Sequence, residues 1–282
     1  MKKNIPSHHN QLENSTVRLM PLSVFHEKQA EVHRDDHYMF ILQQKGDFVV
    51  EVDFNTLELK EAALCFIGPG QVHQYIHQKN NKGWFLFAEA SIISEYYRET
   101  LDMYQWIRQS VIVSEDDFIF DLPPVLEKIE QDKNLPGTSV EISLVESIIG
   151  IIISRIMQQQ IPEKQNNSQK YLITRQFKKF ITENFKTHKQ VQQYAQLLTI
   201  TPLYLNEAVK EVTGYPASFW IQQKIVLEAC RLLSYTAMDV KQIAFELGYD
   251  DPIYFSRFYK KVTGMTALQF RLKNHNLSHH HH

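Results

Sequence analysis

Near the start of the chain, several side chains could bind a metal ion or exchange protons. His33 and His37 lie four positions apart with Asp35 and Asp36 between them, and His73 follows later. Residues four apart on a strand share one face, so His33, His37 and His73 could together hold an ion. Histidines that pack in a core or form hydrogen bonds are the alternative, which we favour. We therefore predict no metal, no cofactor and no catalytic residue.

Other residue patterns also fail to indicate an enzyme or a membrane protein. We find no glycine-rich phosphate loop and no serine–histidine–aspartate cluster that can be placed. Cys65 and Cys230 lie far apart in apolar segments, which excludes a disulfide framework and suits a reducing compartment. The first residues lack a signal-peptide core, and the longest apolar run, 148–153, is far shorter than the ~20 residues of a membrane span. We expect a cytoplasmic protein without membrane contact.

Charge is segregated along the 282 residues. The net charge is −2 overall, but it is −9 in residues 1–169 and +7 in residues 170–282. A basic part of this kind is typical of a partner for a polyanion. The switch in charge coincides with a polar, proline-containing stretch at 158–169, which predicts a linker.

The elements that must position these side chains differ between the two parts. In residues 17–90, short runs rich in β-branched and aromatic residues predict strands that form a small barrel or jelly roll. The expected strands are 38–42, 48–52, 63–67, 72–77 and 84–88, with turns at 45–47 and 68–70. After Ser91 the period becomes helical, at 121–132 and 139–160.

The helix expected at 139–160 carries an apolar stripe with the spacing of a helix–helix seam. Its members are Ile142, Val145, Ile149, Ile152 and Ile156. Two interpretations fit equally well: a seam between two copies of the chain, or packing of the helix on its own barrel. The seam predicts a homodimer, and charged residues at 149 and 152 would then give folded monomers.

The basic part contains an internal duplication. Residues 191–198 match 240–247 at an offset of 49, and Val212–Gly214 match Val262–Gly264 at an offset of 50. Each copy predicts a short helix, a tight turn and a second helix. Gly248 ends one helix, and Asp251-Pro252 and Thr201-Pro202 begin the next as N-cap and first helical residue. The segment 216–235 predicts one rigid helix that joins the copies. Two helix-turn-helix units in a basic domain indicate binding in the major groove of DNA.

At this point the sequence resembles the AraC/XylS family of transcription regulators. The segments that carry the resemblance are Asp239–Ala244, Leu247–Asp251, Tyr254–Arg257, Tyr259–Lys261, Gly264–Thr266 and Phe270–Arg271. The match spans residues 170–273. It departs from the family at three positions. Ala267 stands where proline is common, and Glu207 and Lys224 each stand where arginine is common. Glu207 puts arginine readout by the first unit in doubt, because a carboxylate near DNA repels phosphate.

The first part resembles the family's cupin-like effector domain more loosely, through the segment Gly68–Tyr75. Catalytic cupins bind metal through a His-x-His pair, which the spacing of His33 and His37 does not reproduce. The expected fold is α+β and multidomain: a cupin-like barrel with a helical extension at 1–160, a linker at 161–169, an all-α double helix-turn-helix domain at 170–273, and a tail with a probable tag at 274–282.

Helical spacing places one set of residues on the outward faces of the second helices. They are Leu203, Asn206, Glu207, Lys210, Ile253, Ser256, Arg257, Lys260 and Lys261. Asn206 can pair with adenine, Leu203 can contact a thymine methyl group, and Arg257 is the best guanine reader. Lys260 and Lys261, with Lys178 and Lys179, are expected to bind phosphate.

The resemblance further implies a small polar effector, such as a sugar, inside the barrel. The expected lining is His37, Phe40, His73, Tyr75 and Trp84. His37 is the weakest member, because alternation places it opposite Phe40. The predicted function is a ligand-responsive, sequence-specific regulator that binds double-stranded DNA, with RNA polymerase as an implied partner. The alternatives are a metal-dependent cupin enzyme fused to a helical domain, and a helical protein–protein adaptor.

Overall fold

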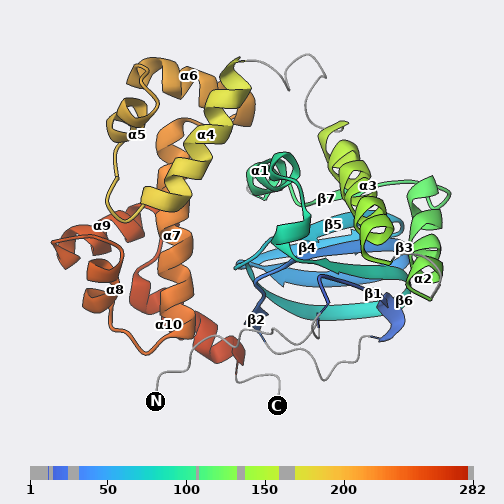
Figure 1. Ribbon diagram of the computed structural model, residues 1–282. Helices are drawn as coiled ribbons and strands as arrows, with labels where there is room; N and C mark the ends of the chain where they lie inside the picture. Colours follow the sequence, from blue (N-terminus) through green and yellow to red (C-terminus); the bar gives the residue numbers. More distant parts are fainter. Residues whose placement is uncertain are drawn as a thin grey trace. The chain divides into compact units, whose positions relative to one another are not determined.

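The computed structural model describes residues 12, 15–24, 32–105, 108–131, 137–158 and 169–278, without the side chains of 24, 137–138 and 273–278. The chain divides into two compact units whose described parts are residues 12–158 and 169–278 (Figure 1). The predicted linker at 161–169 lies outside the described residues except for Gln169, as do the first 11 residues and the terminal histidines 279–282. No helix in the described ranges has the length and apolarity needed to cross a membrane.

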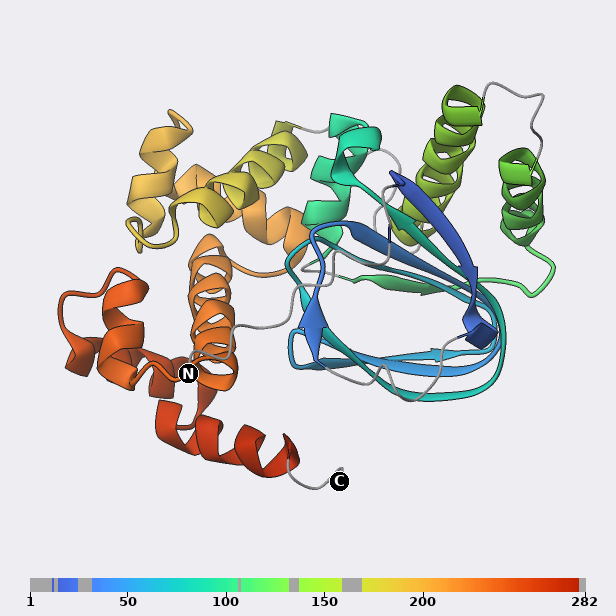
Figure 2. The same ribbon diagram turned by 60° about the horizontal axis from the view of Figure 1, so that its bottom comes forward.

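Within the described residues, the first unit contains a seven-stranded antiparallel sheet. Its strands are β1 (Val17–Pro21), β2 (His33–Arg34), β3 (Tyr38–Val52), β4 (Asn55–Lys60), β5 (Ala63–Ile67), β6 (Val72–Ala88) and β7 (Ser110–Ile112). The order is β1-β6-β3-β5-β7, with β2 paired to β6 and β4 to β3. Figure 2 shows the strands curving round into a barrel. The α+β, multidomain prediction is confirmed.

Two long strands replace predicted pairs of short ones. β3 runs without a break through the expected turn at 45–47, and β6 joins the expected strands 72–77 and 84–88. Gly46 has φ 105°, and the pairing of β3 with β6 shifts register around it. The glycine therefore bends the strand through a bulge instead of ending it. The predicted turn at 68–70 is present, with Gly70 at φ 75°.

Alternate residues of the strands fill the barrel with a continuous apolar core. Its buried members are Leu12, Leu22, Met39, Ile41, Phe48, Val50, Val52, Leu59, Ala63, Cys65, Ile67, Tyr75, Phe85 and Phe87. Helices α1 (Glu95–Tyr104), α2 (Leu122–Gln131) and α3 (Gly137–Gln158) follow, with short 3-10 helices η1 (Leu22–Val24), η3 (Ala90–Ile92) and η4 (Phe118–Asp121). α2 and α3 pack together and contact β1 and β7 respectively. These helices cover the outer face of the sheet.

The second unit is helical throughout its described residues. It comprises α4 (Gln169–Asn184), α5 (Val191–Leu197), α6 (Pro202–Thr213), α7 (Ala217–Tyr235), α8 (Val240–Glu246), α9 (Pro252–Thr263) and α10 (Ala267–Ser278). α5 with α6 and α8 with α9 form the two predicted helix-turn-helix units, and α7 is the predicted connecting helix between them (Figure 1). α7 contacts both units, so it holds them in a fixed relation.

The helix boundaries follow the capping residues. The side chains of Thr201 and Asp251 accept hydrogen bonds from backbone N–H groups in the first turns of α6 and α9, and proline follows each. In the turn between α8 and α9, Gly248 has φ 77°, as predicted. The matching position between α5 and α6 is Thr199, which has φ 57° although it is β-branched. The duplication is therefore structural as well as sequential.

Candidate functional site

The outward face of α9 carries the polar and basic residues expected there. Ile253 is 63% exposed, and Arg257, Lys260 and Lys261 are also exposed. Phe255 and Tyr259, on the opposite face, are fully buried, as helical spacing predicts. Ser256 is exposed, with its hydroxyl donating to the Pro252 carbonyl at 2.9 Å. Side chains that could reach base edges and phosphates thus share one solvent-facing surface.

The outward face of α6 is less complete than predicted. Leu203 is 69% exposed, and Glu207 and Lys210 are also exposed. Asn206 is only partly exposed, and its Oδ1 accepts a hydrogen bond from the Ala217 N–H at 3.0 Å. Bidentate pairing with adenine needs both the oxygen and the nitrogen of the amide. The assignment of Asn206 as an adenine reader is therefore corrected: it ties α6 to the start of α7.

Lys178 is a second correction. We expected this lysine to bind phosphate, but its side chain is buried and its Nζ lies 4.2 Å from the centroid of the Trp220 ring. Burial lowers the pKa of Lys178 to about 7. A buried ammonium cannot reach a phosphate, so Lys178 belongs to the packing of α4 on α7. Lys179, its exposed neighbour, remains available for that contact.

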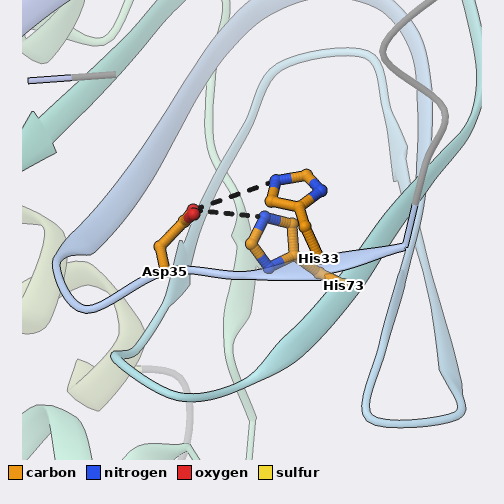
Figure 3. Close-up of side chains that lie close together, drawn as sticks. All are labelled: His33, Asp35 and His73. Carbon is orange, nitrogen blue, oxygen red and sulfur yellow. Dashed lines mark ion pairs between the residues drawn. The ribbon is translucent and has the colours of Figure 1, made fainter. Parts of the chain in front are cut away.

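Inside the barrel, three imidazole nitrogens converge on one carboxylate. Nε2 of His73, His37 and His33 lie 3.5, 3.7 and 4.0 Å from Asp35 Oδ2. All four residues are buried, with at most 4% of each exposed. Figure 3 shows the rings of His33 and His73 side by side, facing the Asp35 carboxylate. Among the described residues, His33, Asp35 and His73 each offer an atom that could ligate a metal, and these three atoms lie within 4.8 Å of one another.

The environment of this group raises the pKa of the Asp35 carboxyl far above its ordinary value. Burial, with a smaller contribution from the nearby Asp36 charge, raises the pKa of Asp35 to about 7. Neither Asp35 oxygen accepts a hydrogen bond within the described part of the chain. A buried carboxylate in such surroundings is costly unless it is paired or coordinates an ion.

Only three of the five residues predicted to line the effector site face the barrel interior. His37, His73 and Tyr75 share the barrel interior, and His37 lies edge-on to Phe87, a member of the core. Phe40 and Trp84 point to the opposite face of the sheet. Phe40 stacks on Tyr38 there, and Trp84 Nε1 donates to Glu127 of α2 at 3.2 Å. The weakest predicted member, His37, is thus inside, while Phe40 and Trp84 are corrected to the outer face.

Two residues of the interior group were left out of the predicted lining. His33, Asp35 and His37 occupy alternate positions in the chain: His33 belongs to β2, whereas Asp35 and His37 lie in the short segment, bent at 36–37, that leads into β3. The spacing of His33 and His37 grouped these two residues with His73 as a possible ion site, but not with the effector lining. Asp35 was not predicted to belong to either group.

The apolar stripe of α3 packs within its own unit. Val145, Ile149, Ile152 and Ile156 are buried in the single chain, with at most 1% exposed, while Ile142 is partly exposed. Ile148 and Ile153 are buried as well. The buried face is therefore wider than the narrow stripe of a coiled-coil seam, which uses only two residues of every seven. The alternative of packing on its own domain therefore describes these residues, and the seam assignment is corrected.

Comparison with known proteins finds the same two parts. A family model described as an AraC-like ligand binding domain matches residues 25–103, and one described as a helix-turn-helix domain matches residues 194–273. A ligand-binding barrel joined to this helical unit defines a ligand-responsive DNA-binding regulator. The chain belongs to the AraC/XylS family of transcription regulators, as the sequence resemblance predicted.

Individual relatives match most of the chain. The arabinose operon regulatory protein of Escherichia coli is 21% identical over 83% of this chain and 80% of its own length. The protein of the same name from Salmonella typhimurium is 20% identical over 83% of each. Among solved structures, the C-terminal domain of AraT, a response regulator from Geobacillus stearothermophilus, is 27% identical over 38% of this chain and 88% of that domain, with a TM-score of 0.35. Both of these curated relatives are named as operon regulatory proteins.

Proposed function

We propose that the chain controls transcription by binding specific duplex DNA through α6 and α9, in response to a small polar effector held in its barrel. The observation that carries the proposal is the pair of matched helix-turn-helix units in a part of net charge +7. Each unit exposes one face of its second helix. α7, which joins them, has 19 residues and is about 28 Å long. A rigid connecting helix keeps α6 and α9 at a fixed spacing, which two recognition helices need in order to reach successive major-groove faces ~34 Å apart.

Within this interface, α9 supplies the main readout and α6 a lesser one. Arg257 is the proposed guanine reader, while Lys260 and Lys261 contact phosphate. Ile253 and Ser256 of α9 make further contacts with base edges. On α6, Leu203 contacts a thymine methyl group and Lys210 contacts phosphate. Glu207 can accept from a cytosine amino group.

Two further partners follow from the family. We propose that two copies bind two half-sites as a homodimer in the cytoplasm, and that RNA polymerase is the machinery on which the bound regulator acts. Since the α3 stripe is buried within one chain, another surface must join the copies.

We expect Arg257→Ala and Lys260→Ala to weaken DNA binding in different ways. Arg257→Ala should cost about 1–3 kcal/mol and relax the preference at one base pair, because one bidentate contact is lost. Lys260→Ala should weaken all sequences about equally and reduce the salt slope by about one. The measurement is fluorescence anisotropy on a duplex selected by this protein from a random library, at several salt concentrations.

Lys60→Ala, an exposed lysine of the barrel, is the matched control and should leave affinity unchanged. Binding that does not depend on salt, or an identical loss of affinity and specificity in both variants, would contradict these roles. Absence of any selected sequence would contradict the DNA-binding function itself.

We propose that the effector is a sugar or a related polar metabolite. The barrel interior supports this, because it combines aromatic faces with hydrogen-bonding groups, as ligand sites do. Tyr75 and Phe48 lie edge-on to each other, and the Tyr75 hydroxyl lies 3.1 Å from Met39 Sδ. Membership of the same family as arabinose operon regulators adds to the support for a sugar.

A thermal-shift screen of sugars and small acids should therefore give a hit. A ligand that binds only the folded state raises the unfolding temperature by mass action. Tyr75→Phe should weaken that hit by about 2–10-fold, because one hydrogen bond to the ligand is lost. Trp84→Phe, on the outer face, should leave it unchanged. If Trp84→Phe abolishes the hit and Tyr75→Phe does not, the effector binds elsewhere.

A further inference from the structure

The barrel interior brings metal-ligating atoms of three side chains to one point (Figure 3). A nitrogen of His33, a carboxylate oxygen of Asp35 and a nitrogen of His73 all lie within 4.8 Å of one another, and all three residues are buried. We infer that the effector domain binds one divalent transition-metal ion on these three residues, apart from any role in reading DNA.

The spacing of the three groups fits a shared ion better than direct bonds. Asp35 Oδ2 is 3.5 Å from His73 Nε2 and 4.0 Å from His33 Nε2. Protein hydrogen bonds of this type have donor–acceptor distances of about 2.7–3.2 Å. In a tetrahedral site with metal–ligand bonds of about 2.0 Å, neighbouring ligand atoms are about 3.3 Å apart. The groups are thus too far apart to bond one another, and a small inward movement places them around an ion.

The fold, and not chance proximity, sets this arrangement. His33 of β2 is the register partner of His73 of β6, so the two side chains lie directly opposite each other across an antiparallel pair. Their ring centroids are 4.2 Å apart. Asp35 follows His33 by two residues and lies on the same face. The paired strands β2 and β6 therefore supply the two histidines, and the residue directly after β2 supplies the carboxylate.

The surroundings of His73 prepare it for coordination. Its Nδ1 lies 3.2 Å from the Gln71 carbonyl oxygen, which can only accept, so in the neutral ring Nδ1 carries the proton and Nε2 is the unprotonated nitrogen that can donate a lone pair to a metal ion. Gln71 itself is anchored: its side chain accepts from the Gly68 N–H and donates to Asp53. His37 Nε2, 3.7 Å from Asp35 Oδ2, acts as a positioning residue for the carboxylate.

The ligand set selects a class of ion. Two imidazoles and one carboxylate suit Zn²⁺, Co²⁺, Ni²⁺ or Fe²⁺, whereas Mg²⁺ and Ca²⁺ prefer oxygen ligands. Three protein ligands also leave a coordination position for water or another oxygen ligand. An ion here would bridge β2 and β6, so it should raise the stability of the barrel.

The test is metal binding by the full chain, with His279–His282 replaced by serine in every sample because those imidazoles bind the same ions. Zn²⁺ titrated into the metal-free protein by calorimetry should bind with about one ion per chain, and Co²⁺ should give visible absorption bands of a tetrahedral site. Mg²⁺ should not bind. EDTA should lower the unfolding temperature of the loaded protein.

Asp35→Asn and His73→Ala should each weaken Zn²⁺ binding by at least about 100-fold, and His37→Ala by about 10–100-fold. His77→Ala, an exposed histidine on the same strand, is the matched control and should bind like the parent chain. Circular dichroism checks that each variant keeps the barrel, and His33→Gln provides a second, milder ligand change.

Two results would overturn the inference. One is no Zn²⁺ or Co²⁺ binding by the folded parent chain. The other is binding that persists unchanged in folded Asp35→Asn and His33→Gln variants, which would place the ion on the surface. Neither result bears on DNA binding, which is measured separately.

Discussion

Gly248→Ala is expected to destabilise the helical unit by about 2–5 kcal/mol. Gly248 has φ 77°, a conformation that costs about 1–2 kcal/mol for a residue with a Cβ. The added Cβ would also lie 1.8 Å from the backbone carbonyl oxygen of Lys186, which must move. Overpacking of this kind costs about 1–3 kcal/mol more. Denaturant unfolding monitored by circular dichroism measures the change.

Gly214 and Gly264 are matched controls for this variant. Both have nearly the same φ, 79° and 78°, but an added Cβ would meet nothing within 4 Å at either position. Their alanine variants should therefore show only the conformational cost of about 1–2 kcal/mol. If all three alanine variants lose the same stability, the close approach of the Lys186 segment to the turn contributes nothing, and the argument fails.

The same glycine shows what the sequence can predict about the helical unit. Its helix-ending role and positive φ follow from its place after an apolar helix, and the capping residues Thr201 and Asp251 fix the starts of α6 and α9. These are local effects, so they can be inferred from neighbouring residues. The contact with Lys186 joins segments about 60 residues apart, and no local pattern indicates it.

The barrel was less predictable, for the same reason. Runs of β-branched and aromatic residues locate the strands, but Gly46 can serve either as a turn or as a bulge, and only pairing with β6 decides between them. The site follows this rule too. Spacing grouped His33 and His37 with His73 as a possible ion site, whereas the place of Asp35 in that group and the position of His73 directly opposite His33 depend on the bend before β3 and on strand register.

Ile149→Glu is expected to unfold the first unit instead of producing a folded monomer. Ile149 is fully buried in the single chain, as are Val145 and Ile152 of the same helix. Removing the side chain alone costs about 2–5 kcal/mol, and a buried carboxylate adds a penalty of several kcal/mol. The total is comparable with the stability of a whole domain. Circular dichroism with analytical ultracentrifugation should show loss of the barrel's unfolding transition.

Two variants separate this effect from a change at an interface between copies. Ile149→Val should cost only about 0.5–1.5 kcal/mol and keep the fold, while Ser147→Glu, exposed on the same helix, should stay within about 0.5 kcal/mol of the parent chain. A folded, stable monomer from Ile149→Glu would restore the seam interpretation, because only a residue exposed in the free chain can accept a charge without loss of stability. Six apolar residues of α3 are buried within one chain, so the apolar face of this helix already packs in the core of its own domain. Any surface that joins two copies must therefore lie elsewhere.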